Sequence, residues 1–275
     1  MAVERISRAD DPRIAAYAGV RDGDLVRSRG LFVAEGRLVV RRVVEDARYR
    51  VESVLLNDAA LHDLASTVAA LAADVPIFIG DTDDLAGIAG YDVHRGCLAL
   101  VHRPTATPVD ELIASAQDVV VLEGVSNADN VGGVFRNAAA FGAGGVLLSP
   151  TCCDPLYRKA IRTSMGASLR VPFARAAGQD WPGVLARVRA AGFTIVALTP
   201  REPAETLDAF AARPRASRVA LMVGTEGAGL TPAVEAAADH RVRIPIDDGV
   251  DSLNLAVAVG IALYAICQSG NRVIG

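Results

Sequence analysis

Three stretches in the second half of the chain carry side chains that could hold a polar ligand. They are Asn127–Gly142, Gly224–Leu230 and Ser252–Asn254. The first contains Asn130 and Arg136, and the second contains Glu226. The third contributes Ser252 and Asn254. Glycines let the backbone approach a ligand closely, and the last two stretches lie beside two predicted strand ends and the start of a buried helix. These two strand ends and the helix outline a pocket.

Each stretch also has a purely structural interpretation. Asn130 lies where the cap of a predicted helix belongs, and Arg136 would then be a solvated residue in the second turn of that helix. The glycine stretch is not a GxGxxG fingerprint, and such a stretch alone is most often a turn. Ser252 is likewise expected to cap a helix that begins at Leu253. The stretches are therefore informative only in combination.

The elements around the last two stretches are the most strongly patterned of the chain. A continuous apolar run predicts a strand at Val219–Val223, and a second strand is predicted at Arg241–Ile246. The helix Leu253–Cys267 is apolar on nearly every face. Since such a helix is buried on all sides, we expect it to pack against the sheet and against a second subunit.

Strands and helices alternate along the rest of the chain, which is typical of an α/β fold with a mostly parallel sheet and helices on both faces. In the second half, strands are also predicted at Val119–Leu122, Gly145–Leu148, Leu169–Phe173 and Phe193–Leu198, and helices at Asn130–Phe141, Leu156–Ser164 and Trp181–Ala191. In the first part, strands are predicted at Gly30–Ala34, Val51–Leu56, Val75–Ile79 and Cys97–Val101, and helices at Pro12–Gly19, Leu38–Ala47, Asp58–Ala72 and Thr82–Ala89. The predicted domains are residues 1–103 and 118–275, joined by a proline-containing linker at 104–117.

Composition excludes several classes of protein. The mean hydropathy of +0.30 indicates a globular protein, and no apolar run reaches the roughly 18 residues of a membrane helix. The charged N-terminus lacks the apolar core of a signal peptide, so we expect a cytoplasmic protein. The four cysteines and four histidines have no zinc-ligand spacing, and we therefore expect no metal site.

The charge distribution bears on the partner. The formal net charge of −4 argues against a general nucleic-acid binder. Residues 1–50 nevertheless hold eleven Arg against eight Asp and Glu, and only one of the chain's 28 basic residues, Lys159, is a lysine. A GC-rich genome would favour arginine over lysine, and arginine also suits bidentate phosphate contacts. Both explanations stay open.

In combination, the three stretches resemble the motifs of the SpoU (TrmH-like) family of RNA ribose 2′-O-methyltransferases, within the SPOUT superfamily. The matching segments, in the order of the motifs, are Asn130–Gly142, Gly224–Leu230, and Ile244–Ile246 with Ser252–Asn254. Arg158–Ala167 also resembles the Ser-x-Gly-Ala stretch of the family. The resemblance extends from Asp118 to about Gln268.

This resemblance implies features of the fold that no hydrophobic pattern predicts. SPOUT domains pass their C-terminal segment through a loop, which makes a deep trefoil knot, a rare exception to unknotted topology. They dimerise through this region, so the chain is expected to form a homodimer. The N-terminal unit, with Phe32–Gly36, resembles the L30e-like RNA-binding domain that many members carry.

The resemblance also implies S-adenosylmethionine (AdoMet) as methyl donor, held largely by backbone groups. The residues implied at the cofactor are Gly224, Ile244, Leu253, Leu198, Thr199 and Gly229. The residues implied at the reacting ribose hydroxyl are Arg136, Asn130, Glu226, Ser252 and Asn254. The family mechanism often treats the arginine as general base, but a guanidinium, with a pKa above about 12, is a poor base at neutral pH. We expect Arg136 to orient the hydroxyl and to stabilise developing negative charge.

The expected substrate is 23S ribosomal RNA, because family members with an added N-terminal unit more often act on the large ribosomal subunit. Transfer RNA is the alternative substrate. The residues expected to contact RNA are Arg8, Arg29, Arg37, Arg162 and Ser164. The modest basic excess of the first 50 residues suits recognition of a folded RNA by shape and 2′-hydroxyl contacts.

Two other classes of protein compete with an active methyltransferase. A catalytically silent RNA-binding or ribosome-assembly factor on the same fold is disfavoured because Arg136, Glu226 and Asn254 are all present. A Rossmann-type nucleotide enzyme is disfavoured because the dinucleotide fingerprint is missing. A phosphate-loop NTPase is excluded, since Lys159 does not lie in a GxxxxGK[ST] motif.

Overall fold

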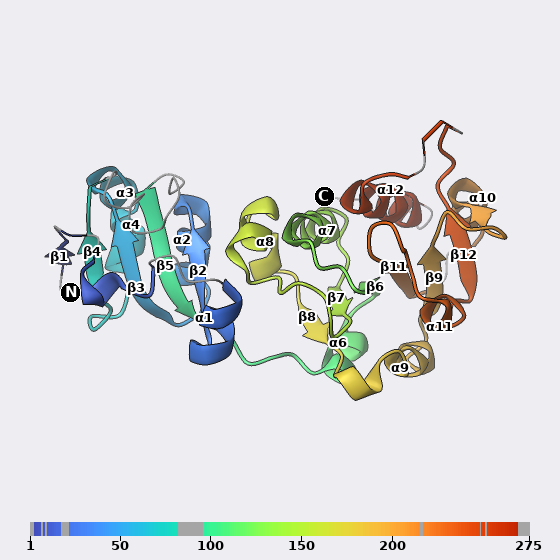
Figure 1. The fold of residues 1–275 in the computed structure, drawn as a ribbon, viewed down its shortest axis with the longest axis horizontal. Helices are drawn as coiled ribbons and strands as arrows, with labels where there is room; N and C mark the ends of the chain where they lie inside the picture. The colour runs from blue at the N-terminus through green and yellow to red at the C-terminus, as the bar shows by residue number, and fades with distance from the viewer. Residues whose placement is uncertain are drawn as a thin grey trace. The chain divides into compact units, whose positions relative to one another are not determined.

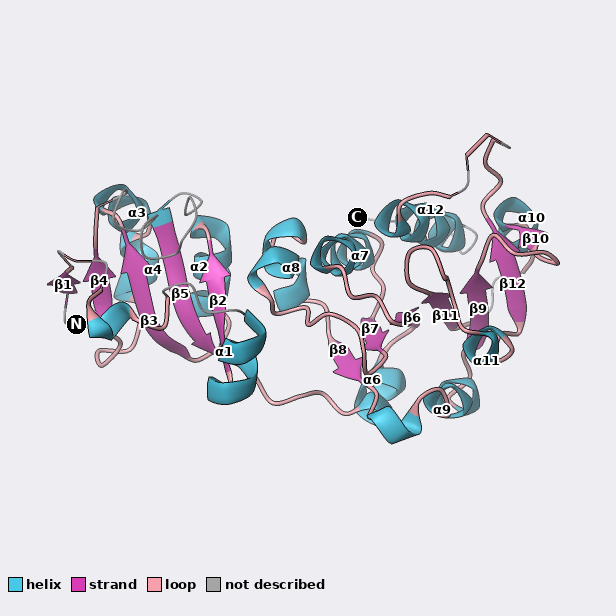
Figure 2. Ribbon diagram, in the orientation of Figure 1, coloured by secondary structure: helices cyan, strands magenta, loops and turns pink. Residues whose placement is uncertain are grey.

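The computed structural model describes residues 3–6, 8, 10–17, 22–81, 96–214, 217–247, 249–250 and 252–268, and of Arg27 only the backbone. The chain divides into two compact units. One comprises residues 1–105 and 156–169, and the other comprises residues 106–155 and 170–275. Helices flank strands in both units (Figures 1 and 2).

The first unit is built on a mixed five-stranded sheet of order β1-β4-β3-β5-β2, counted over the described residues. Its strands are β1 (Val3–Arg5), β2 (Leu31–Glu35), β3 (Val51–Leu56), β4 (Ile77–Ile79) and β5 (Cys97–His102). Its helices are the 3-10 turn η1 (Pro12–Ile14), α1 (Asp22–Arg29), α2 (Arg37–Glu45), α3 (Asp58–Asp63) and α4 (Ala65–Ala69). Alternating apolar residues of β2 and β5, including Leu31, Val33, Leu98 and Leu100, belong to one buried cluster that stabilises this sheet.

A segment from the middle of the chain completes the first unit. It contains α8 (Arg158–Thr163) and the 3-10 turn η3 (Ala167–Leu169). Asp22 accepts hydrogen bonds from the backbone N–H and the Nε of Arg158, at 2.9 and 2.8 Å. The hydroxyl of Tyr49 donates to the carbonyl oxygen of Leu169 at 2.7 Å. The predicted boundaries assign residues 156–169 to the second domain, whereas packing groups them with the first unit.

The second unit is built on a seven-stranded sheet of order β10-β12-β9-β11-β6-β7-β8, in which every pairing between described strands is parallel. The strands are β6 (Asp118–Leu122), β7 (Gly145–Leu148), β8 (Phe173–Arg175), β9 (Thr194–Leu198), β10 (Glu205–Thr206), β11 (Val219–Val223) and β12 (His240–Arg243). The helices are α6 (Val109–Ser115), α7 (Ala128–Ala140), the 3-10 turn η4 (Gly178–Asp180), α9 (Val184–Ala190), α10 (Leu207–Ala211), α11 (Pro232–Glu235) and α12 (Leu255–Gln268). The predicted α/β fold with a mostly parallel sheet is confirmed.

Helices cover both faces of this parallel sheet. In Figure 1, α7 and α12 lie on one side of the strands, and α6 and α9 lie on the other. Alternate residues of β6, such as Val119 and Val121, pack with α6 and α9 in one core cluster. The intervening Val120 and Leu122 are also buried, which explains why β6 is apolar without alternation. Parallel strands place their carboxyl ends at one edge of the sheet, and the candidate site lies there.

Helices α7 and α12 pack closely through small residues. A Cβ atom on Gly133 would lie only 2.5 Å from the Cβ of Ala256, so this contact requires glycine or a shift of the helices. The side-chain amide of Asn137 donates to the carbonyl oxygen of Ala256 at 2.6 Å. These contacts fix the start of α12 against α7, the two helices that carry the predicted catalytic residues.

Several predicted elements differ from the structure. The single helix expected over Asp58–Ala72 is interrupted at Leu64, between α3 and α4. The strand expected over Leu169–Phe173 begins only at Phe173, because Pro172 has no N–H to donate to a ladder. Residues 109–115 of the expected linker form α6. The elements β1 and α1 were not expected, and the helix expected over Thr82–Ala89 lies outside the described residues.

Candidate active site

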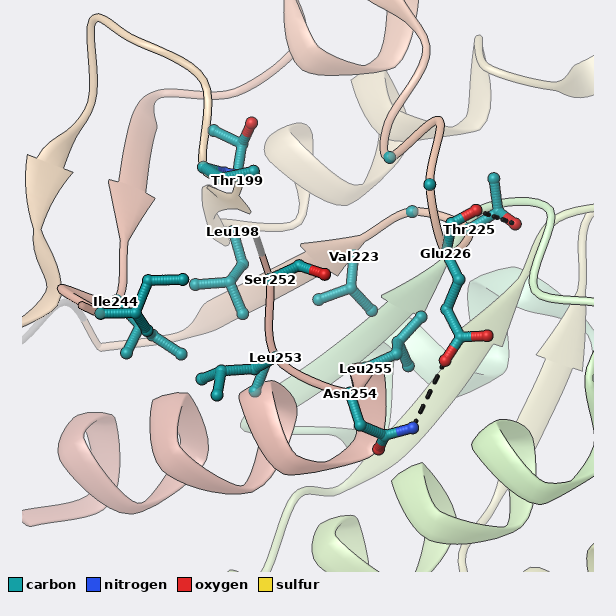
Figure 3. Close-up of a pocket in the computed structure, with 16 residues that line it drawn as sticks. Leu198, Thr199, Val223, Thr225, Glu226, Ile244, Ser252, Leu253, Asn254 and Leu255 are labelled. Carbon is teal, nitrogen blue, oxygen red and sulfur yellow. Dashed lines mark hydrogen bonds between the residues drawn. The ribbon is translucent and has the colours of Figure 1, made fainter. Parts of the chain in front are cut away.

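A cavity of about 450 Å³ lies at the carboxyl ends of β9, β11 and β12, beside the start of α12. We call it the aliphatic cavity, because the side chains of Leu198, Ile244, Ile246 and Leu253 line it. Figure 3 shows Leu198, Ile244 and Leu253 close together on one side of it. Its volume lies within the range of small-molecule sites.

The loop after β11 forms a second wall of the aliphatic cavity from main chain. A Cβ atom on Gly224 would collide with backbone atoms of Gly229 and Leu230, so only glycine fits where the loop closes on itself. The N–H of Gly229 donates to the carbonyl oxygen of Thr225 at 2.9 Å, and Gly229 has a left-handed φ of +68°. The loop therefore presents peptide groups to the cavity. Of the predicted cofactor residues, all six line it: Gly224, Gly229, Leu198, Thr199, Ile244 and Leu253.

Polar side chains from three segments meet at the rim of the aliphatic cavity. The side-chain amide nitrogen of Asn254 donates to Oδ1 of Asn130 at 3.0 Å and to Oε1 of Glu226 at 3.3 Å. Asn130 is 3 % exposed, whereas Glu226 is exposed. In Figure 3, Glu226 and Asn254 point toward one another. Asn254 therefore links the exposed Glu226 carboxylate to the buried Asn130, and this link holds the carboxylate in place.

The two predicted helix caps are wrong, for the same reason. Asn127, not Asn130, caps α7: its side chain accepts from the N–H of Asp129 at 2.9 Å. Asn254, not Ser252, caps α12: its Oδ1 accepts from the N–H groups of Ala256 and Val257, at 3.0 and 3.3 Å. Each helix begins near several residues that can cap, and the sequence alone does not select among them. Asn130 and Ser252 are thereby free of the structural role that competed with a functional one, and Ser252 lines the cavity.

Arg136 lies apart from this hydrogen-bonded group. It is exposed on α7 and does not line the aliphatic cavity. Within the described part of the chain, its guanidinium has no hydrogen-bond or ion-pair partner. The structure thus brings Asn130, Glu226 and Asn254 together and leaves Arg136 available to a ligand.

A charged cluster supports the strand ends behind the cavity. Glu235 of α11 pairs with Arg201 at 3.2 Å and with Arg241 at 2.9 Å. Burial alone would raise the pKa of Glu235, but the hydrogen bond with Thr199 and the two guanidinium groups hold the pKa below its ordinary value. Since Thr199 lines the aliphatic cavity, the ionised carboxylate fixes part of the wall.

The five predicted RNA contacts fall into three groups. Arg8, Arg29 and Arg37 form ion pairs at the surface of the first unit, with Asp10, Glu52 and Asp63 respectively. Arg162 is exposed on α8. Ser164 is only 1 % exposed; its hydroxyl donates to the carbonyl oxygen of Ile161 at 2.9 Å and accepts from the N–H of Ser168 at 3.3 Å. Its position argues against the predicted RNA contact, because a buried hydroxyl that is already bonded cannot reach a ligand.

Sequence reasoning missed several residues of the site. Ile246 and Leu255 line the aliphatic cavity and were not predicted as site residues, although Ile246 lies within the matching segment Ile244–Ile246 and Leu255 follows Asn254. Within the described ranges, no cluster of three or more His, Cys, Asp or Glu is placed to hold a metal ion. Nor does any helix of the described segments have the length and apolar character needed to span a membrane.

Comparison with known proteins places these features in a family context. A family model described as the SpoU rRNA Methylase family matches residues 117–264. An uncharacterized tRNA/rRNA methyltransferase of Mycobacterium tuberculosis (strain ATCC 25618 / H37Rv) is 38% identical over 275 residues, which cover 98% of this chain and 94% of the relative. A relative of the same description from Mycobacterium bovis has the same identity and coverage.

Two solved structures share the fold over nearly the whole chain. The AdoMet-bound rRNA methyltransferase from Sinorhizobium meliloti superimposes with a TM-score of 0.83 at 23% identity, covering 98% of this chain and 99% of that one. A structure described as an RNA 2′-O ribose methyltransferase gives a TM-score of 0.76 at 25% identity, covering 96% and 98%.

Proposed function

The chain belongs to the SpoU rRNA Methylase family and is an RNA methyltransferase, and from this premise we propose that it transfers a methyl group from AdoMet to a ribose 2′-hydroxyl of 23S ribosomal RNA. The observation that carries the proposal is the bond network in which Asn254 joins the buried Asn130 to the exposed Glu226, at the rim of the aliphatic cavity. This network fixes a carboxylate at the place where the hydroxyl that accepts the methyl group would have to meet AdoMet.

The aliphatic cavity fits AdoMet. A volume of about 450 Å³ suits a molecule of this size, and the leucine and isoleucine side chains offer an apolar surface to an adenosyl group. The peptide groups of the loop Gly224–Leu230 offer hydrogen bonds without a charged side chain. When bound, AdoMet supplies a methyl group that its sulfonium already activates. Leu198, Ile244 and Leu253 would hold the adenosyl part, and Gly224 and Gly229 would approach it by backbone.

Glu226 and Asn254 have separate roles in this proposal. Both donor hydrogens of the Asn254 amide are used, one by Asn130 and one by Glu226, and its oxygen caps α12. Asn254 is therefore a positioning residue. The carboxylate of Glu226 is exposed and accepts only one hydrogen bond from the described residues, so it can also accept the hydrogen bond of an incoming 2′-hydroxyl. A hydroxyl held in this way directs its lone pair at the donor.

Arg136 provides the positive charge in this proposal. Its guanidinium, exposed and unpaired within the described residues, can bind the phosphate next to the target ribose and stabilise negative charge that develops on the oxygen. Ser252 lines the cavity and adds a hydroxyl that can donate to the same oxygen. In these roles, Arg136 and Ser252 orient the 2′-hydroxyl and do not form a covalent bond with the substrate.

Two observations favour oxygen over a base carbon as the methyl acceptor. Methylation of a pyrimidine carbon needs a nucleophile such as a cysteine thiolate, and none of the four cysteines lines the aliphatic cavity. The similar structure at 25% identity is described as an RNA 2′-O ribose methyltransferase. The choice of 23S ribosomal RNA rests on the family description and on the added N-terminal unit, and tRNA is the second candidate because the 38%-identical relatives are named tRNA/rRNA methyltransferases.

A homodimer is part of the proposal. Val257, Ile261 and Tyr264 of α12 are 52%, 39% and 54% exposed, and spacings of four and three residues place them on one helix face. Ala256 and Gly260, by contrast, pack against α7. We infer that a second copy covers the exposed apolar face. Ile261→Glu should therefore halve the mass measured by light scattering, and an unchanged mass would argue against this face as the interface.

Three further expectations accompany this proposal. The trefoil knot, the L30e-like character of the first unit and a cytoplasmic location remain predictions from the resemblance and the N-terminal sequence.

The experiment that tests the substrate uses the purified protein, radiolabelled AdoMet and total RNA from a strain that lacks the gene. Ribosomal RNA and tRNA are separated after the reaction. We expect the label in 23S ribosomal RNA. Label confined to tRNA would overturn the choice of substrate, and label in neither RNA, with AdoMet bound, would favour a catalytically silent RNA-binding factor.

A further inference from the structure

A second cavity, of about 660 Å³, lies on the other side of the loop that follows β11. It is formed at the carboxyl ends of β6, β7 and β11, where Gly124, Ser149 and Thr225 follow their strands. Trp181, just after η4, contributes the aromatic part of the lining, and we call this space the tryptophan cavity. No step of the proposed methyl transfer uses it.

The indole of Trp181 is fixed by a carboxylate. Its Nε1–H donates to Oε1 of Glu123 at 3.1 Å. The same carboxylate accepts from the hydroxyl and from the N–H of Thr231, at 2.9 and 2.8 Å. Glu123 is 7 % exposed and therefore acts within the wall rather than on a ligand. An indole tied in this way loses little freedom when a planar ligand stacks on it.

The lining is wrong for a phosphate and suits a neutral planar group. Among the described residues, the one guanidinium that lines the cavity is that of Arg201, and it is already bonded to the carbonyl oxygens of Leu230 and Ala228 and to Glu235. Pro150, Pro232 and Trp181 supply apolar surface. The hydroxyls of Thr151 and Thr225 stand in the same lining and can pair with a polar edge. The ligand that fits this lining has a flat, apolar face and an edge that forms hydrogen bonds, and a nucleobase has both.

The tryptophan cavity adjoins the aliphatic cavity. Thr225 and Gly229 line both of them. A Cβ atom built on Gly124, in the lining of the tryptophan cavity, would lie 3.9 Å from the Cβ of Thr225. One loop thus separates the two spaces, and Glu226 stands on that loop beside Thr225.

We propose that the tryptophan cavity binds an unstacked nucleobase of the substrate RNA, adjacent to the ribose that is methylated. The proposal rests on the proposed function, because it takes Glu226 as the position of the reacting ribose. It adds a site that would read base identity, with Trp181 as the stacking surface and Thr151 and Thr225 at the base edge. Sequence preference would then reside in this cavity, and the aliphatic cavity would serve only the methyl donor.

The cavity has a built-in reporter, because Trp181 is the only tryptophan of the chain. The full-length protein, with S-adenosylhomocysteine filling the aliphatic cavity, is titrated with each of the four nucleoside 5′-monophosphates and, separately, with ribose 5-phosphate. We expect saturable quenching of tryptophan emission by at least one monophosphate and none by ribose 5-phosphate. Absence of saturable quenching by all four, or equal quenching by ribose 5-phosphate, would overturn the proposal.

A variant that fills the cavity extends the test to RNA. Thr151 is exposed, so Thr151→Phe narrows the space without disturbing the core, and Thr105→Phe is a matched change at another exposed threonine. Thr151→Phe should abolish the quenching and raise the KM for RNA by on the order of tenfold to a hundredfold, while AdoMet affinity is unchanged. An unchanged KM would overturn the proposal.

Failure of this proposal and failure of the proposed function are distinguishable. If the wild-type protein methylates no RNA, the proposed function fails, whereas the fluorescence titration still reports on base binding. Trp181→Phe keeps an aromatic ring that can stack on a base but loses the bond to Glu123. It therefore tests stacking apart from the orientation that this bond gives the ring. If the bond to Glu123 matters only for orientation, this variant should raise the KM for RNA less than Thr151→Phe does.

Discussion

The aliphatic and tryptophan cavities lie on opposite sides of one loop and are lined by different kinds of chemical group. The aliphatic cavity has a wall of main chain between Gly224 and Gly229, and its side chains are mostly leucine and isoleucine. The tryptophan cavity has an indole held by a buried carboxylate, with threonine hydroxyls in the lining. A site that recognises an invariant cofactor can be made of backbone, whereas a site that discriminates among bases needs side chains that can differ.

This difference explains why one cavity is visible in the sequence and the other is not. A wall of main chain needs glycine where the loop closes, so Gly224–Leu230 forms a recognisable stretch. The tryptophan cavity depends on Glu123, Trp181 and Thr231, which are far apart in the sequence and have no common spacing.

The largest effect is expected for Arg136→Lys, which changes neither cavity. Lysine keeps the charge but loses the planar fork that can hold a phosphate and an oxygen together. We expect kcat to fall on the order of a hundredfold, with AdoMet affinity unchanged in calorimetry. Arg187→Lys, in an exposed ion pair on α9, is the control. Near-normal turnover of Arg136→Lys would remove this residue from the chemistry.

Gly224→Ala should damage the aliphatic cavity alone. The added Cβ would collide with the backbone of Gly229 and Leu230, which cannot move aside without opening the loop. AdoMet affinity measured by calorimetry should fall by at least tenfold. Gly178→Ala is the control, because a Cβ there meets nothing within 4 Å, and Gly178 lines the tryptophan cavity instead. Equal loss of AdoMet binding in both variants would contradict the assignment of AdoMet to the aliphatic cavity alone.

Asn254 allows its two roles to be separated. Asn254→Ala removes the cap of α12 and the partner of the buried Asn130, so unfolding free energy should fall by about 2 to 3 kcal/mol in urea titrations. Asn254→Asp keeps an oxygen for the cap but places a second carboxylate beside Glu226. Asn254→Asp should therefore be more stable than Asn254→Ala. Both variants should be inactive, because neither side chain donates a hydrogen bond to Glu226. An active Asn254→Asp would show that Glu226 needs no amide donor.

Glu235→Gln should have the smallest effect and should touch both cavities, because Glu235 is linked to Thr199 in one lining and to Arg201 in the other. Loss of the charge should lower the unfolding free energy by about 1 to 2 kcal/mol at neutral pH. Glu202→Gln, in an exposed pair with Arg243, should change it much less.

The effect of Glu235→Gln should also depend on pH in a defined direction. Because the folded-state pKa of Glu235 is lowered, its stabilisation is present above the ordinary carboxyl value of 4.5 and is lost as the pH falls through the folded-state pKa. The difference in unfolding free energy between wild type and variant should therefore shrink below about pH 4.5. A constant difference down to pH 3 would contradict the assigned contacts.

The sequence predicts local structure well where one pattern dominates. The strands Val51–Leu56 and Val219–Val223 have the predicted bounds, because runs of β-branched and leucine residues admit few alternatives. Helix caps are not predictable where several Asn and Ser residues lie near the start of a helix, as at α7 and α12. The strand β8 begins only at Phe173, although apolar residues precede it, because Pro172 cannot donate a backbone hydrogen bond.

All six predicted cofactor residues line the aliphatic cavity, but the contacts among the polar residues of the site were not predictable. The bond between Asn254 and Asn130 joins positions 124 residues apart, and it depends on β11 pairing with β6 and on α12 packing against α7. Long-range pairing of this kind is decided by the packing of the whole unit and leaves no local pattern. Glu123 comes directly after β6, and its place in the sequence is a signal for the tryptophan cavity, since strand ends in parallel sheets line ligand sites.

The chemical position of the transferred methyl group tests the central claim most directly. RNA labelled by the protein with radioactive AdoMet is hydrolysed in alkali, which cleaves a phosphodiester only where the neighbouring 2′-hydroxyl is free. The proposed reaction predicts that the label is recovered in alkali-resistant dinucleotides, and that RNA with a 2′-deoxyribose at the mapped position accepts no label. Label recovered in mononucleotides as a methylated base would contradict ribose methylation and the role assigned to Glu226.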